Sequence, residues 1–337
     1  MYVEAFTQSK NPKAPLRNED RLVLHADRLF AVIDGVTDKS GETHDGLTGG
    51  QLAGQLIETA LRELVDTHRE FTASAREILD LIDGKFQHEY SRRGLEKRVR
   101  DEPTLRFGAQ LAALFTDGDR IRILQVGDCG VLIDGQAHSG TSQPGDEILG
   151  HVRSHVYQRL RAAGSSSAER LAQARAAIVD GLDSFSTAGT PLSDAAWVEL
   201  REQLLDELPS AFPQLPAQHV IEAARGGLKQ IARHRNTEHP LGHACLDGTT
   251  VPDSFISDTT HSWNRLSVIE LYSDGYFGRP AHGGSVLAWE QHLAHVEKED
   301  PEKIRTVRST KGSAPGCFTD DRTILILRKE TAQHVPV

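Results

Sequence analysis

The first part of the chain alternates between two kinds of hydrophobic pattern. Residues 22–25 and 29–34 are short apolar stretches joined by the polar turn Ala26-Asp27-Arg28, and they predict a β-hairpin. Apolar residues then recur every three or four positions over about 48–69 and again over about 74–90. This is the period of an amphipathic helix, so we expect two helices that each bury one face.

Strand-like patterns return after these helices. Five apolar runs have the length and composition of buried strands: 107–115, 120–126, 131–133, 266–272 and 323–328. The first three are separated by turns rich in Asp and Gly, which predicts an antiparallel meander. Between the last two runs, helical patterns lie near 284–298 and 301–310.

The middle of the chain has a different composition. It is rich in Ala, Arg, Leu, Glu and Gln and lacks clear strand patterns. Candidate helices lie near 146–163, 166–182, 192–208 and 217–235. We therefore predict a mostly helical insertion at 137–263 within a core formed by 1–136 and 264–330.

The order of these elements favours an α+β fold. Runs of antiparallel strands with helices grouped between them suit two packed antiparallel β-sheets flanked by helices, an αββα sandwich, better than a wound βαβ sheet. The 337 residues are 38% hydrophobic and 26% charged, a globular composition with enough length for a sizeable core. Neither a Gly-x-Gly-x-x-Gly nor a Gly-x-x-x-x-Gly-Lys-Ser/Thr motif occurs, so no nucleotide-binding loop is indicated.

The net charge and the hydrophobicity of the chain limit the kinds of partner that we expect it to bind. A net charge of -10 repels nucleic acid and attracts cations, so we expect no nucleic-acid partner. No apolar stretch is long enough for a signal peptide or a membrane span, which predicts a cytoplasmic protein without a membrane contact. Cys129, Cys245 and Cys317 are widely spaced and are expected to be ordinary reduced thiols.

Acidic motifs occupy the predicted strand ends and turns. They are Asn18-Glu19-Asp20, Asp34-Gly35, Gly127-Asp128, Ser273-Asp274-Gly275 and Asp320-Asp321. Carboxylates at neighbouring strand ends would converge and repel each other unless cations neutralised them. Because Mg²⁺ and Mn²⁺ prefer oxygen ligands, the pattern predicts a divalent metal site, with each following Gly allowing close backbone approach. The alternative is that each Asp-Gly or Asp-Asp pair only makes a turn.

Six segments resemble, in order, those of the metal-dependent protein phosphatase family, the type 2C serine/threonine phosphatases and their bacterial relatives. They are Arg17-Asn18-Glu19-Asp20, Phe30-Ala31-Val32-Ile33-Asp34-Gly35-Val36, Phe107-Gly108-Ala109-Gln110-Leu111, Val126-Gly127-Asp128-Cys129, Leu271-Tyr272-Ser273-Asp274-Gly275 and Thr319-Asp320-Asp321-Arg322-Thr323. The resemblance covers roughly residues 14–136 and 264–329 and does not extend to the insertion.

The resemblance implies a phosphatase that hydrolyses phosphoserine or phosphothreonine on a protein substrate. By analogy with the family, Asp34 would bridge two Mg²⁺ or Mn²⁺ ions and the Gly35 carbonyl would bind the second. Asp274 and Asp320 would complete the first. A hydroxide held between the cations would attack phosphorus directly, without a covalent phosphoenzyme.

The resemblance also implies roles for three further residues. Glu19 and Asp20 would act through metal-bound waters, and Asp128 would mark a third metal position. Two other functions stay open: a catalytically weak relative that binds phosphoproteins as a regulator, and a phosphoesterase for small molecules.

This chain departs from the family at several positions. Pro15 stands where the family commonly has a phosphate-binding arginine, and we expect Arg17 or Lys13 to substitute. Val36 stands where some members have a proton-donating histidine. Asp321 replaces the usual Asn of eukaryotic members.

Histidines give no zinc signature. The chain has 16 of them, without a His-Glu-x-x-His motif. His234, His239 and His243 lie close together in the insertion, and we interpret them as packed or surface histidines rather than metal ligands.

Overall fold

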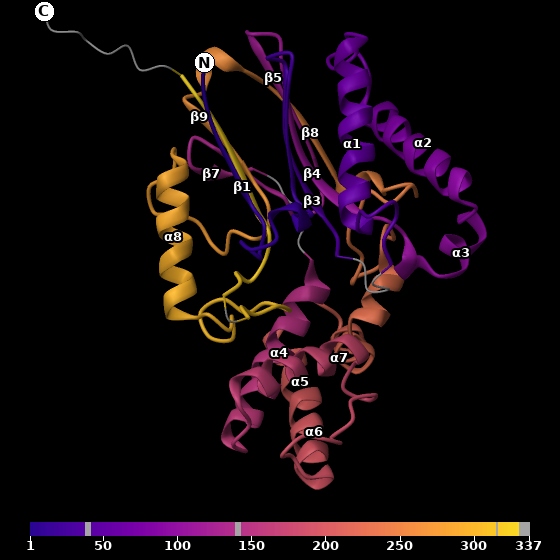
Figure 1. The fold of residues 1–337 in the computed structure, drawn as a ribbon, viewed down its shortest axis with the longest axis vertical. Helices are drawn as coiled ribbons and strands as arrows, with labels where there is room; N and C mark the ends of the chain where they lie inside the picture. Colours follow the sequence, from indigo (N-terminus) through magenta and orange to yellow (C-terminus); the bar gives the residue numbers. More distant parts are fainter. Residues whose placement is uncertain (38–41, 139–142, 315, 330–337) are drawn as a thin grey trace, which may run out of the picture.

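The computed structural model describes residues 1–37, 42–138, 143–314 and 316–329. Two five-stranded antiparallel sheets pack face to face (Figure 1). The first contains, in spatial order, β1 (Tyr2–Gln8), β10 (Arg322–Arg328), β9 (Val268–Tyr272), β6 (Gly130–Ile133) and β7 (Gln136–Ala137). The second contains β2 (Arg21–His25), β3 (Leu29–Gly35), β4 (Ala109–Thr116), β5 (Arg120–Val126) and β8 (Ile256–Ser262).

Helices cover the outer faces of both sheets (Figure 1). α1 (Gly49–Asp66) and α2 (Ala75–Arg93) cover the second sheet, the short α3 (Glu96–Asp101) packs at the end of α2, and α8 (Val286–Glu299) lies on the first sheet. Thr48 and Ser74 start α1 and α2 with capping boxes: the cap hydroxyl accepts a hydrogen bond from the backbone N–H of Gln51 or Glu77, and the side chain of that residue accepts one from the backbone N–H of the cap. The predicted αββα sandwich is confirmed.

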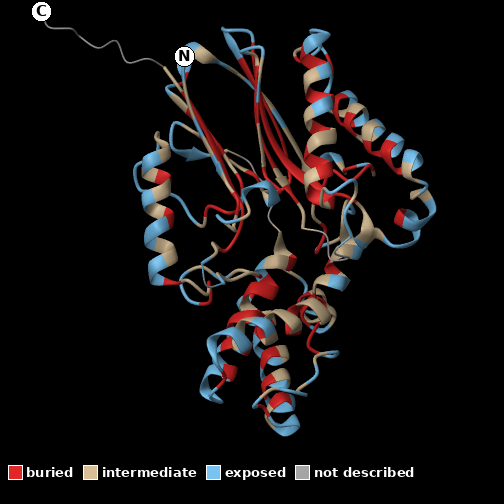
Figure 2. Ribbon diagram, in the orientation of Figure 1, coloured by how far each residue is buried: buried red, intermediate tan, exposed pale blue. Residues whose placement is uncertain are grey.

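The β3 strand shows why the sheets pack as they do. Phe30 and Val32 face the other sheet, whereas Leu29, Ala31 and Ile33 face the helices α1 and α2. Both faces of the strand are therefore apolar, which explains its nearly continuous hydrophobic sequence. Figure 2 shows the result, with buried residues concentrated on the central strands and on the helix faces that contact them.

The helices within the predicted insertion pack around a core of their own. They are α4 (Pro144–Ala162), α5 (Ser167–Asp180), α6 (Asp194–Ala211) and α7 (Ala217–Ile231). Buried residues such as Tyr157, Trp197 and Leu204 pack between these helices. These helices lie beyond one end of the sandwich (Figure 1).

The short 3-10 helices are η1 (Pro15–Arg17), η2 (Pro103–Leu105), η3 (Ala232–His234), η4 (Asp253–Phe255) and η5 (Trp263–Arg265). Within the described ranges, no helix is both long and apolar enough to cross a bilayer.

β1, β6 and β8 differ from the sequence prediction, and the two-residue β7 was not predicted either. β6 does not continue the meander of β4 and β5: the chain turns at Gly127, which has a φ of 92°, and β6 pairs with β9 in the other sheet. β8 lies within the segment expected to lack strands, and it pairs with β5. Its sequence is polar and lacks the hydrophobic pattern that predicts a strand, because an edge strand has little apolar surface to bury. β1 was not anticipated either, and it pairs with β10.

The helix expected at 301–310 is also absent. The buried Asp300 side chain accepts hydrogen bonds from the backbone N–H groups of Ile304, Arg305 and Thr306 at 3.1, 2.8 and 3.0 Å. These N–H groups are thereby taken from helical partners, and the segment forms a loop instead.

Two glycines let separate segments meet at the acidic end of the sandwich. A Cβ at Gly35 would lie 2.5 Å from the Glu19 carbonyl oxygen, and a Cβ at Gly275 would lie 1.9 Å from that of Asp321. Only glycine fits at these two positions, because the backbone of another segment occupies the place of a side chain.

Replacing Gly275 by alanine should therefore destabilise the protein by about 1–3 kcal/mol, because the methyl group overlaps the Asp321 carbonyl. The matched control is Gly84→Ala in α2, where a Cβ meets no atom within 4 Å. It should raise stability by about 0.5–1 kcal/mol through helix propensity. Urea unfolding measures both changes, and equal midpoints for the two variants would contradict this steric account.

Candidate metal centre

Carboxylates from distant parts of the sequence meet at the end of the sandwich that faces the insertion. Asp34 is the second-last residue of β3, Asp274 follows β9, and Asp320 precedes β10. The Asp34 and Asp274 carboxyl groups are hydrogen-bonded to each other. Asp320 is buried, Asp34 is half-buried, and Asp274 is accessible through a cavity. The convergence predicted for these three residues is present.

The N-terminal acidic pair is held by hydroxyl groups. Glu19 Oε2 accepts a hydrogen bond from Thr37 Oγ1 at 2.6 Å, and Glu19 Oε1 accepts one from Thr48 Oγ1 at 2.7 Å. Asp20 Oδ2 accepts one from Ser273 Oγ at 2.6 Å. These contacts fix both carboxylates, and they place that of Asp20 near Asp274.

Asp128 connects the sandwich to the insertion. Its backbone N–H donates to Gln110 Oε1 at 2.8 Å, and its Oδ2 accepts from Gln143 Nε2 at 2.6 Å. Asp146, on α4, lies close enough to raise its pKa further. Sequence reasoning did not identify Gln143 or Asp146, because they lie at the start of a helix that no motif linked to the cluster.

Two lysines neutralise one side of the cluster. Lys311 Nζ forms an ion pair with Asp320 Oδ2, and Lys10 Nζ lies 3.7 Å from Asp320 Oδ1 and 3.6 Å from Asp321 Oδ2. Burial acts to raise the pKa of Asp320, but the two ammonium groups outweigh it and lower that pKa below its ordinary value. Neither lysine had a local sequence signal.

Lys10 also pairs with Glu19 Oε2 at 3.4 Å, whereas Asp20, Asp34 and Asp128, all of them described residues, form no ion pair with either lysine. Burial, reinforced by repulsion from the neighbouring carboxylates, raises the pKa values of Asp34 and Asp128 well above the ordinary range. Burial likewise raises the pKa of Asp20 to about 8, although the Ser273 hydrogen bond opposes it. Asp128 Oδ1 is buried without a hydrogen-bond partner among the described residues.

This donor set fits hard divalent cations. All its side-chain ligands are carboxylate oxygens on rigid strand ends, and the two lysines leave several negative charges uncompensated. Cations such as Mg²⁺ or Mn²⁺ would supply the missing positive charge.

A cavity of about 240 Å³ opens beside the cluster. Asp34, Asp128 and Asp274 line one part of it, and basic residues line another: Arg106, Arg175, Lys229, Arg235 and Lys311. Arg17, the predicted phosphate ligand, is exposed in η1 and is not among the residues that line the cavity.

Comparison with known proteins finds similar solved structures. The serine/threonine phosphatase PstP/Ppp of Mycobacterium tuberculosis has 16% identity over 98% of this chain and 99% of that chain, with a TM-score of 0.42. The PstP catalytic domain in complex with two manganese ions has 18% identity over 96% of both chains and a TM-score of 0.42. Serine/threonine phosphatase Stp1 from Staphylococcus aureus has 12% identity over 98% of this chain and 96% of that chain, with a TM-score of 0.43.

No family model and no curated protein sequence matches the chain. The three structural matches belong to the class that the sequence motifs resemble. Likeness at this level of identity and TM-score carries no argument about activity, so the functional case depends on the carboxylate cluster and its cavity.

The raised pKa of Asp20 predicts a pH dependence for the metal-free protein. A carboxyl group whose pKa rises from 3.8 to about 8 on folding binds more protons in the folded state, so it removes stability as the pH rises through that interval. We therefore expect the melting temperature of Asp20→Asn to fall less between about pH 4 and pH 8 than that of the unmodified protein. Calorimetry in the presence of a chelator measures this difference, and parallel pH profiles would contradict it.

Proposed function

We propose that the protein is a Mg²⁺- or Mn²⁺-dependent phosphatase that hydrolyses phosphoserine or phosphothreonine on a protein substrate. The observation that carries this proposal is the meeting of Asp34, Asp274 and Asp320, which come from three strand ends, beside one cavity. Turns that happened to contain Asp would have no reason to bring their side chains together at such an electrostatic cost.

The metal ligands in this proposal are Asp34, the Gly35 carbonyl, Asp274 and Asp320, with Asp128 as the residue of a third position. Glu19 and Asp20 hold water molecules in the same centre. When bound, the cations supply Lewis-acid activation of water and neutralise phosphoryl oxygens.

The protein's own residues perform the remaining tasks. Thr37, Thr48 and Ser273 fix Glu19 and Asp20 so that these carboxylates can accept protons from water. Val36 offers no proton to the leaving oxygen, so in this proposal a water molecule in the cavity protonates it.

We further propose that Arg175 and Lys311 hold the phosphate in place of the arginine that Pro15 replaces. Arg175 Nη1 donates to the Thr310 carbonyl at 2.7 Å, which fixes the guanidinium beside Lys311. Both side chains line the cavity, and both lie near Asp320. A phosphoryl group next to the acidic cluster would meet this pair, because guanidinium and ammonium groups are strong phosphate donors.

The first test is metal-dependent turnover. The purified protein should hydrolyse an aryl phosphate with Mn²⁺, and Asp34→Asn and Asp274→Asn should each lower kcat/KM by about 100-fold or more, which is about 2.7 kcal/mol. The control Asp206→Asn changes an exposed residue on α6 and should be neutral. Melting curves should show that both cluster variants fold, because each substitution removes a repelling charge.

A folded, manganese-loaded protein without turnover would favour the phosphoprotein-binding alternative. A preference for small phosphate esters over phosphothreonine peptides would favour the small-molecule phosphoesterase.

The second test locates the phosphate ligand. Arg175→Ala should raise KM for a phosphothreonine peptide by about 10- to 100-fold, since a hydrogen bond to a charged group is worth about 1.5–3 kcal/mol. Arg175→Lys should recover part of the loss. Arg17→Ala is the matched comparison, and a large rise in KM for that variant alone would return the role to Arg17.

A further inference from the structure

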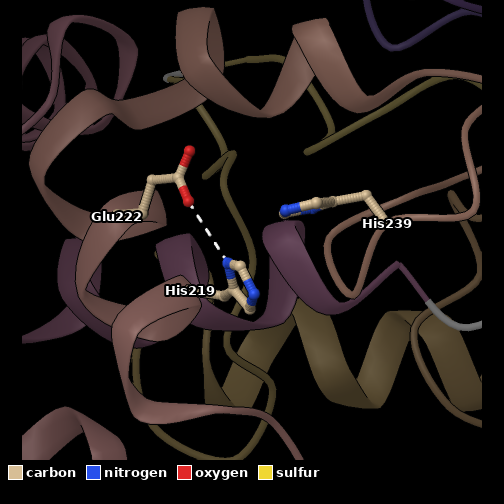
Figure 3. A group of neighbouring side chains, drawn as sticks. All are labelled: His219, Glu222 and His239. Carbon is tan, nitrogen blue, oxygen red and sulfur yellow. Dashed lines mark hydrogen bonds and ion pairs between the residues drawn. The ribbon is translucent and has the colours of Figure 1, made fainter.

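Histidine and glutamate side chains meet in the helical insertion, in a cluster separate from the acidic centre (Figure 3). His219 and Glu222 lie one turn apart at the start of α7, so they share a face of that helix. His239 comes from the segment that follows η3. One candidate ligand atom from each of the three residues lies within 4.8 Å of the others.

The three side chains point toward one another (Figure 3). His219 Nδ1 lies 3.3 Å from Glu222 Oε2, and the rings of His219 and His239 have centroids 4.5 Å apart. Ligands at about 2.0–2.1 Å from a tetrahedral Zn²⁺ ion lie about 3.3–3.5 Å from each other. Small side-chain rotations would bring all three to that spacing.

A fourth side chain stands next to this group. The His234 ring stacks on the His239 ring with a centroid separation of 3.8 Å and an interplanar angle of 9°. His234 Nε2 lies 3.5 Å from Glu222 Oε1 and is buried without a hydrogen-bond partner among the described residues. The two Glu222 oxygens therefore face two different imidazoles.

The chemistry of the cluster suits a metal ion that takes nitrogen ligands. Glu222 Oε1 accepts a hydrogen bond from Gln230 Nε2, which holds the carboxylate in place. Imidazoles with one carboxylate are a common zinc donor set.

We propose that His219, Glu222 and His239 bind a Zn²⁺ ion, with His234 in reach as a fourth ligand; this replaces the sequence-based interpretation of His234 and His239 as packed or surface histidines. Nitrogen donors distinguish this site from the acidic centre, which offers only oxygen and suits Mg²⁺ or Mn²⁺. In the absence of the ion, the Leu241 N–H donates to His239 Nδ1 at 3.1 Å. Binding exchanges this one neutral hydrogen bond for a bond to the metal.

The proposed zinc site lies next to a segment that forms part of the wall of the cavity beside the acidic cluster. The ion would tie α7 to the segment that carries His239. Arg235 and His243, which flank His239 in the sequence, are joined by a backbone bridge and both line the cavity beside the acidic cluster. Zinc would therefore brace the wall of that cavity from the insertion side.

The experiment is a zinc titration of the full chain without an affinity tag, so that no added histidines bind metal. To separate the two centres, the titration is done in an Asp34→Asn/Asp274→Asn background, which disables the acidic centre. We expect one Zn²⁺ per chain by calorimetry and elemental analysis. His219→Ala and His239→Ala should each weaken binding at least tenfold. His295→Ala, which changes an exposed histidine on α8, should leave it unchanged.

Cobalt provides a second measurement that does not depend on activity. Co²⁺ bound by three or four nitrogen and oxygen ligands in tetrahedral geometry should give strong visible absorption, and His219→Ala should abolish it in a protein whose melting curve is intact. The proposal fails if the background protein binds no zinc, or if either histidine variant binds zinc as tightly as the His295→Ala control. Both results leave the phosphatase proposal unaffected, because the acidic centre is tested separately.

Discussion

Repulsion among carboxylates held at the ends of packed strands is the constraint on which the candidate centre depends. Two apolar sheet faces press against each other and against their helices, and this packing fixes the backbone from which Asp34, Asp274 and Asp320 project. The side chains cannot separate without disturbing that core, so the charge must be compensated where it stands. Lys10 and Lys311 do part of this, while burial and mutual repulsion raise the pKa values of Asp34 and Asp128.

Residues of the sandwich and of the insertion both line the cavity. The sandwich contributes the acidic side through strand ends, which are rigid supports for ligands. The insertion contributes Gln143, Asp146 and Arg175 from its helices α4 and α5. The two units have separate hydrophobic cores but meet at the cluster, because Gln143 donates a hydrogen bond to Asp128 and Asp146 raises its pKa. A change in this part of the insertion would therefore alter both the substrate contacts and the Asp128 end of the carboxylate cluster.

Two kinds of donor chemistry occur in the one chain. The acidic centre offers carboxylate oxygens in a region of high negative potential, whereas the insertion cluster offers imidazole nitrogens with a single carboxylate. Ligand type and charge govern metal preference, so the two sites would select different ions from the same solution. The segment between His234 and His243 links them, because its histidines reach the insertion cluster at one point and the cavity at another.

The sequence by itself determined the elements whose burial has a regular period, such as α1, α2 and β3, because hydrophobic spacing is a local property of the chain. It also determined the acidic motifs, since an Asp followed by Gly at a strand end is a local signal. Tertiary structure alone decided which sheet β6 joins, that the polar β8 forms an edge strand, and that Lys311 and Arg175 reach the carboxylates. It also brought His219 to His239. These features arise from contacts between residues far apart in the chain, and such contacts cannot be predicted from local composition.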